Sequence, residues 1–214
     1  MSDNLVLGLW GIGGYLLGSI PFGLVLCYLA GYGDIRKIGS GNIGATNVLR
    51  TGNKMLALLT VILDASKAGI IAWLAFRFTS VKPIVFAEHI TNFNVLAALV
   101  AGSLAVIGHN FPVWLKFKGG KGVASAFGFI LALQPSVALA AIGVWLVMAF
   151  TFKYSSLSAI VAAIAVPVIT FFYCPLIYAI FFGALAALVL VRHHANIYRL
   201  IKGQESKIKL KKER

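Results

Sequence analysis

Long apolar runs separated by short polar segments follow one another along almost the whole chain. They predict membrane-spanning helices over residues 5–30, 55–76, 93–107, 123–133, 136–152, 156–173 and 176–190. The run 123–133 has only eleven residues, and at about 1.5 Å per residue it is too short for a hydrocarbon core of about 30 Å. Seven spans are therefore expected, or six if this helix reaches only part of the way across.

Composition supports a membrane protein built from helices. The chain has 214 residues, of which 60% are hydrophobic, and a mean hydropathy of +0.91, too apolar for a water-soluble domain. We predict an all-α, polytopic integral membrane protein that forms a single domain over residues 1–214.

The net charge of +13 does not indicate a nucleic-acid partner, because the basic residues lie between and after the apolar runs. With the N-terminus outside, sixteen of the 19 Lys and Arg residues fall on the cytoplasmic side, including the basic tail 191–214. The positive-inside rule then favours seven spans with the C-terminus in the cytoplasm, against anionic membrane lipids.

One glycine-rich basic loop separates the runs 93–107 and 123–133. It reads Gly108-His-Asn-Phe-Pro112 and then Gly119-Gly-Lys-Gly122. Glycines leave the backbone amides uncovered, and the first amides of a helix lack intrahelical partners. With the ammonium group of Lys121 they form a seat for a phosphate. The alternative is an ordinary tight basic turn.

Two more polar stretches carry candidate chemistry. The first loop is dense in small hydrogen-bonding residues and ends with an arginine suited to bidentate phosphate binding; its candidates are Gly39, Ser40, Gly41, Asn42, Thr46, Asn47 and Arg50. After the last run, His193, Asn196 and Arg199 share a face if the segment is helical. The alternatives are an ordinary connecting loop and interfacial residues at a helix end.

The sequence has few of the residues and motifs that metal-dependent or covalent catalysis requires. Its six acidic residues have no metal-binding spacing, and neither a His-x4-Asp acyltransferase signature nor a GxSxG elbow occurs. Asp64 and Lys67, at i and i+3 in an apolar run, are expected to neutralise each other. We expect no metal and no cofactor, and favour binding of a phosphorylated substrate with positioning of a transfer reaction.

Taken together, these motifs resemble the bacterial acyl-phosphate:glycerol-3-phosphate acyltransferase family. The resemblance spans almost the full length and rests on Ser19-Ile-Pro-Phe-Gly23, the 39–47 loop with Arg50, Leu63-Asp-Ala-Ser-Lys67, Gly108-His-Asn-Phe-Pro112, Gly119-Gly-Lys-Gly-Val-Ala124, and His193 with Asn196, Arg199, Gly203 and Glu205. Departures are small: Ser125 replaces a more usual Thr, and Ala68 a common Gly.

The resemblance implies a seven-helix enzyme of the bacterial inner membrane whose active site faces the cytoplasm. Such an enzyme moves a fatty acyl group from acyl phosphate to the 1-hydroxyl of glycerol 3-phosphate, giving lysophosphatidic acid and phosphate, and we expect it to act as a monomer. The implied catalytic residues are Ser40, Arg50, Lys121, His193 and Asn196. The residues implied to bind substrate are Gly39, Gly41, Asn42, Thr46, Asn47, His109, Asn110, Gly119, Gly120, Gly122, Ser125 and Arg199. The implied structural residues are Asp64, Lys67 and Glu205.

A competing class is a transporter or exchanger of a small phosphorylated solute, because broken helices also serve transport. A non-catalytic membrane subunit that recruits a soluble partner through its basic tail is a third reading. The polar stretches favour the enzyme, because they gather on one face of the membrane rather than at its midplane.

Overall fold

The structure is a computed structural model that describes residues 1–208. Residues 209–214, the end of the predicted basic tail, lie outside the described residues. The chain divides into two compact units, Met1–Pro135 and Ser136–Arg214. The single membrane-embedded domain predicted from the sequence stays a prediction.

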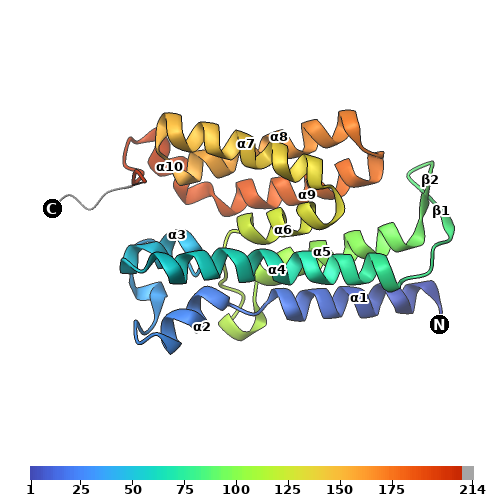
Figure 1. Ribbon diagram of the computed structural model, residues 1–214, viewed down its shortest axis with the longest axis horizontal. Coiled ribbons are helices and arrows are strands. Elements are labelled where there is room, and N and C mark those ends of the chain that lie inside the picture. The colour runs from blue at the N-terminus through green and yellow to red at the C-terminus, as the bar shows by residue number, and fades with distance from the viewer. Residues whose placement is uncertain (209–214) are drawn as a thin grey trace. The chain divides into compact units, whose positions relative to one another are not determined.

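The first unit is a bundle of long and short helices (Figure 1). Its helices are α1 (Asp3–Gly18), α2 (Phe22–Leu29), α3 (Ala45–Val48), α4 (Lys54–Phe78), α5 (Phe93–Asn110) and α6 (Val123–Leu133). Single turns of 3-10 helix lie in its loops: η1 (Ile35–Lys37), η2 (Leu49–Thr51) and η3 (Val113–Leu115). A hairpin of β1 (Pro83–Phe86) and β2 (His89–Asn92) joins α4 to α5.

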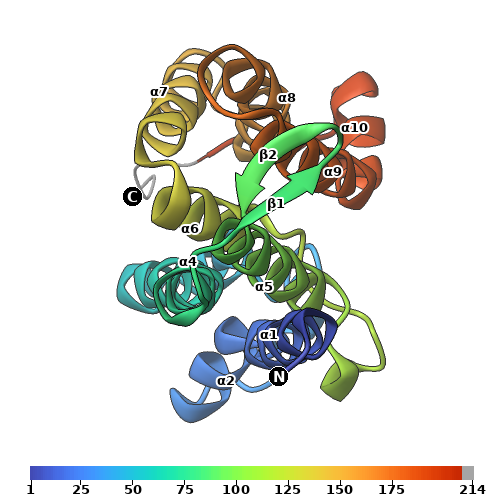
Figure 2. The same ribbon diagram turned by 90° about the vertical axis from the view of Figure 1, so that its right-hand side faces the viewer.

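Small residues bring the long helices of this unit close together. Figure 2 shows α5 between α1 on one side and α4 with α6 on the other, and α5 packs against all three. A Cβ on Gly14 or Gly18 of α1 would overlap the backbone of α5 at Ala101 or Ala105. Close backbone approach at small residues is the usual way in which membrane helices associate.

The first apolar run, residues 5–30, is broken at Pro21. α1 ends at Gly18 and α2 begins at Phe22, with Pro21 between them. Proline has no N–H to continue a helix, and the groups freed by such a break need other partners. The carbonyl of Ile20 finds two, the backbone N–H of Phe22 at 3.1 Å and the ammonium group of Lys67 at 2.8 Å.

The connection between α4 and α5 contains regular structure. β1 and β2 pair in antiparallel register through a turn at Ala87 and Glu88, whose φ angles are 49° and 67°. Two residues with positive φ match the twist of a hairpin, although neither is the usual Gly or Asn. An ion pair between Lys82 and Asp3 ties the start of the hairpin to the N-terminus of α1.

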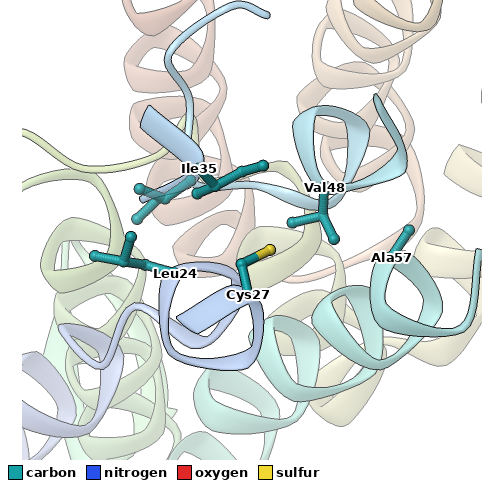
Figure 3. Packing of buried hydrophobic residues seen from close by; sticks show 6 residues of the cluster. Leu24, Cys27, Ile35, Val48 and Ala57 are labelled. Atoms are coloured by element: carbon teal, nitrogen blue, oxygen red, sulfur yellow. The ribbon is translucent and has the colours of Figure 1, made fainter. Parts of the chain in front are cut away.

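The first loop folds over α2 and the start of α4 through its own small core (Figure 3). The buried members of this cluster are Leu24, Cys27, Ile35, Ile43, Val48 and Ala57. Leu115 of η3 packs against it as well, so the first loop and the loop after α5 lie at the same end of the unit. The N-terminus and the hairpin lie at the other end (Figure 1).

The second unit consists of helices joined by short turns. They are α7 (Pro135–Phe152), α8 (Ser155–Tyr173), α9 (Leu176–Arg192) and α10 (His194–Ile201). α8 packs along α9, and α10 turns away from α9 by 58° at His193.

Several helices are long and apolar enough to cross a membrane. Within residues 1–208 there are five such segments: Asp3–Leu29, Lys54–Phe78, Phe93–Leu115, Pro135–Phe152 and Ser155–Tyr173. The bent pair of α9 and α10 is a sixth candidate. α6 occupies the eleven residues of the short apolar run, about 16 Å of helix, and so does not meet this length on its own.

Candidate active site

Asn47 organises the first polar loop from within. Its side chain is buried, and its amide Nδ2 donates to the carbonyl oxygens of Ile35 at 2.9 Å, Ile38 at 3.0 Å and Asn42 at 2.8 Å. The two hydrogens of one buried amide are therefore shared among three carbonyl oxygens and fasten the loop at three points. Backbone carbonyls enclosed by a loop need such partners.

The oxygen of the same side chain faces Ser40 and Arg50. Asn47 Oδ1 accepts hydrogen bonds from Ser40 N at 3.0 Å, from Ser40 Oγ at 3.2 Å and from Arg50 Nη1 at 3.4 Å. Gly39 has a φ of 57°, and a Cβ there would overlap the guanidinium of Arg50. Ser40 and Arg50 are themselves exposed. Two of the predicted catalytic residues, Ser40 and Arg50, thus share the acceptor Asn47 Oδ1 at the surface of the loop.

The glycine-rich turn before α6 lies directly on the end of α5. The amides of Gly119 and Gly120 donate to the carbonyls of Asn110 at 3.1 Å and His109 at 3.0 Å. These two amides are therefore not uncovered, contrary to the prediction. A Cβ on Gly120 would overlap the imidazole of His109, so the glycine here is required by close packing rather than by an anion.

The N-terminus of α6 has backbone amides that could bind an anion. Gly122 precedes the helix with a φ of 83°, and the first amides of α6, beginning at Val123, have no intrahelical partner. Lys121 stands in the turn just before them. Apart from the amides of Gly119 and Gly120, the phosphate seat stays a prediction.

Two buried polar side chains line this region without a hydrogen-bond partner among the described residues. Neither Asn110 nor Ser125 is accessible to solvent, and no such partner contacts the Asn110 amide or the Ser125 hydroxyl. The Asn110 amide lies against Gly122, where a Cβ would meet its oxygen at 2.8 Å. Buried polar groups are seldom left unpaired, so these two mark a place where a polar ligand or water is expected.

Behind the turn lies a buried ionic cluster. Lys67 Nζ is 2.9 Å from Asp64 Oδ1 and 3.0 Å from His109 Nδ1, and His109 Nδ1 is 3.5 Å from Asp64 Oδ1. All three side chains are at most 5% exposed. The predicted neutralisation of Asp64 by Lys67 is confirmed, whereas the approach of His109, 42 residues further along the chain, was not foreseen.

In the second unit, Glu205 gathers the polar residues around α10. Its Oε1 accepts hydrogen bonds from Ser156 Oγ and Asn196 Nδ2, each at 2.7 Å, and its Oε2 pairs with Arg199 Nε at 2.6 Å. Burial by itself would raise the pKa of this carboxyl, but the three hydrogen bonds and the charge of Arg199 outweigh it and hold the pKa below its ordinary value. Ser156 was missed from the sequence, because one serine in a serine-rich turn gives no signal.

His193 occupies the bend between α9 and α10. The residue is 3% exposed, and its Nδ1 lies 2.8 Å from the carbonyl oxygen of Val189. A carbonyl oxygen can only accept, so Nδ1 carries the hydrogen and Nε2 of the neutral ring is the basic nitrogen. Asn196 follows three residues later and is buried as well.

Comparison with known proteins decides the family. The model of the glycerol-3-phosphate acyltransferase family matches residues 8–203. This chain belongs to the glycerol-3-phosphate acyltransferase family.

Individual relatives agree with this assignment over nearly their whole length. The glycerol-3-phosphate acyltransferase of Rhodospirillum rubrum is 53% identical over 215 residues, covering 100% of this chain and 96% of the relative. The enzyme of Paramagnetospirillum magneticum is 52% identical over 202 residues, covering 94% of each chain.

Solved structures show the same fold. PlsY (YgiH), an integral membrane glycerol 3-phosphate acyltransferase, superposes in its glycerol 3-phosphate form with a TM-score of 0.84 at 37% identity, covering 95% of this chain and 96% of that one. Its lysophosphatidic acid form gives a TM-score of 0.82 at 36% identity, covering 95% of each chain. The acyltransferase described here is accordingly a helical, multi-pass membrane enzyme.

Proposed function

We propose that this acyltransferase moves a fatty acyl group from acyl phosphate to the 1-hydroxyl of sn-glycerol 3-phosphate. The products are lysophosphatidic acid and inorganic phosphate. The observation that supports the proposal is the N-terminus of α6, whose first amides have no intrahelical partner and follow Lys121 in the chain. The buried side chains of Asn110 and Ser125 have no hydrogen-bond partner among the described residues. Two phosphorylated substrates need more than one such seat, and Arg50 on the first loop supplies a second.

The transfer needs no covalent enzyme intermediate. The 1-hydroxyl oxygen attacks the acyl carbonyl carbon, the bond from that carbon to the bridging phosphate oxygen breaks, and phosphate leaves with the electron pair. The hydroxyl proton passes to a base, for which we propose His193 Nε2, since Nδ1 is engaged by Val189. Because acyl phosphate already carries a good leaving group, positioning and electrostatic stabilisation supply the rest.

The roles of the remaining site residues are proposals that their contacts support. We propose that Ser40 and Asn196 orient glycerol 3-phosphate, Arg50 and Lys121 hold phosphate, and Asn47 acts on substrate only through Ser40 and Arg50. Roles in substrate binding are kept for Asn42, Thr46, Asn110, Ser125 and Arg199, and a structural role for Glu205. We propose that His109 and the closely packed glycines of the turn before α6, Gly119, Gly120 and Gly122, shape the phosphate seat.

The proposed topology has seven spans, with the N-terminus outside, the C-terminus in the cytoplasm and the active site facing the cytoplasm of a bacterial inner membrane. The Asp3–Lys82 pair supports it, because it keeps the N-terminus and the hairpin on one side of the first unit. The first loop and the turn before α6 lie at that unit's opposite end (Figure 1). We propose that the enzyme acts as a monomer.

Product formation by the purified enzyme tests the proposal. Labelled glycerol 3-phosphate is supplied with palmitoyl phosphate or with palmitoyl-CoA, each in the presence of EDTA. Lysophosphatidic acid from the acyl phosphate alone is the expected result. Product from palmitoyl-CoA alone would overturn the proposed donor, and solute counterflow in vesicles without product would favour a transporter.

A further inference from the structure

We infer that Asp64, Lys67 and His109 form a positioning group that holds the glycine turn 119–122 in register with the N-terminus of α6. None of the three needs to touch substrate for this role. The inference deepens the proposed function, because it rests on this turn being part of a phosphate seat.

The first step is the way in which Lys67 uses its hydrogens. Its ammonium group donates to the carbonyl oxygen of Ile20 at 2.8 Å and contacts His109 Nδ1 at 3.0 Å. Asp64 Oδ1, at 2.9 Å, neutralises it as an ion-pair partner rather than as a hydrogen-bond acceptor. Since Lys67 can only donate, Nδ1 of His109 accepts and the ring hydrogen resides on Nε2. Lys67 therefore fixes both the tautomer and the plane of the imidazole.

The second step is the contact between His109 and Gly120. The Nε2 edge of the ring lies where a Cβ of Gly120 would be, and the amide of Gly120 donates to the carbonyl oxygen of His109 at 3.0 Å. One residue thus touches the turn with its side chain and binds it with its backbone. A rotated ring would displace Gly120 and, with it, the adjoining Lys121.

The cluster also ties together three elements that are remote in sequence. Ile20 lies in the break between α1 and α2, Asp64 and Lys67 belong to α4, and His109 ends α5. Replacing a buried ion pair by apolar residues is often neutral for stability, so stability alone does not explain the pair. The pair faces His109, and we infer that it holds the imidazole ring in place against Gly120.

Hydrogen exchange of the turn tests the inference without relying on activity. The variant is Asp64→Asn with Lys67→Met, which removes both charges together and leaves no orphan ion in the core. The control is Thr60→Val, a buried change on the same helix at a hydroxyl that binds only its own backbone at Leu56. Exchange is followed by mass spectrometry in peptides covering residues 117–123.

In the double variant, the amide hydrogens of Gly119 and Gly120 are expected to exchange at least about fivefold faster than in wild type. The exchange rates of the other peptides from α4, α5 and α6 should be unchanged. Thr60→Val should match wild type. Unchanged exchange in the turn, or an equal increase throughout α4, α5 and α6, would overturn the inference. If the double variant is not folded, Lys67→Arg keeps the charge, alters the geometry and is measured in the same way.

Kinetics provide a readout that a loss of folded enzyme would not change. A smaller folded fraction lowers the apparent kcat, whereas a displaced turn raises KM for glycerol 3-phosphate. Combining the double variant with Lys121→Ala should raise KM little beyond Lys121→Ala alone, because both act through one turn. Fully additive effects would contradict the inference, whereas an inactive wild-type enzyme would contradict the proposed function and leave the exchange result standing.

Discussion

A single acceptor, Asn47 Oδ1, holds Ser40 by both its backbone nitrogen, at 3.0 Å, and its hydroxyl, at 3.2 Å. Ser40 is exposed, and Asn47 beneath it is buried. The exposed residue therefore gets its position from the buried one, whose amide nitrogen is in turn bound to three backbone carbonyls. The proposed role of this loop therefore depends on a side chain that need not contact substrate.

Replacing Asn47 by Ala should therefore disable the loop. Three enclosed carbonyls lose their donor, which costs about 1–3 kcal/mol of stability, and Ser40 loses its anchor. We expect kcat/KM to fall at least about 100-fold at saturating acyl phosphate. Asn53→Ala is the control: it removes the cap of α4, a bond to Leu56 N at 3.1 Å, and should cost about 1 kcal/mol with kcat/KM preserved. Near-normal kcat/KM in Asn47→Ala would remove Asn47 from the site.

Gly120→Ala should abolish most of the activity for a steric reason. The added methyl group would overlap the ring of His109, which is enclosed and has no room to retreat. We expect at least about a 100-fold loss of kcat/KM and a lower melting temperature in detergent. Gly143→Ala in α7, where a Cβ meets nothing within 4 Å, should be silent or slightly stabilising. An active, stable Gly120→Ala enzyme would show that the turn tolerates displacement.

The sequence is informative where the physics is local. The helix at 123–133 follows from an apolar run bounded by Gly122 and Pro135, and the break near Pro21 from the missing proline N–H. The ion pair of Asp64 and Lys67 follows from their spacing of three on a helix. Each of these needs only the chain within one or two turns.

What the sequence could not predict depends on distant partners. His109 reaches Lys67 across 42 residues, and Glu205 reaches Ser156 across 49. The hairpin at 83–92 turns through Ala87 and Glu88, residues that seldom adopt positive φ, so its turn had no recognisable signal. The sequence predicts uncovered amides at Gly119 and Gly120, because their hydrogen bonds to the end of α5 depend on the fold.

Lys121→Ala should chiefly raise KM for glycerol 3-phosphate, by at least about tenfold, because a phosphate loses a charged partner. Lys118→Ala, an exposed change three residues earlier in the same loop, is the control for loss of positive charge in general. Raising the salt concentration should blunt the small effect of Lys118→Ala more than that of Lys121→Ala. An unchanged KM in Lys121→Ala would remove this residue from the phosphate site.

Glu205 makes a specific contribution to the pH dependence of stability. Its pKa lies below the ordinary value of 4.5 in the folded enzyme, so its stabilising effect is fully present above pH 4.5 and is lost as the pH falls through the lowered pKa. The melting temperature of Glu205→Gln should accordingly lie below that of wild type from pH 5 to 8, with the gap closing in acid. Arg50→Gln, which leaves the Glu205 contacts untouched, should show a pH-independent difference from wild type. A constant gap for Glu205→Gln down to pH 3 would contradict the lowered pKa.

Two substitutions at His193 distinguish the roles of its two ring nitrogens. His193→Asn keeps a donor near the position of Nδ1, which binds the Val189 carbonyl at 2.8 Å, but has no basic atom in place of Nε2. His193→Gln reaches the position of Nε2 with an amide that cannot take a proton at neutral pH. If Nε2 is the general base, both variants lose at least about 100-fold in kcat, and the loss shrinks at high pH, where the substrate hydroxyl gives up its proton more readily. If His193→Gln keeps nearly wild-type kcat and only KM rises, His193 orients the substrate and the substrate's own phosphate takes the proton.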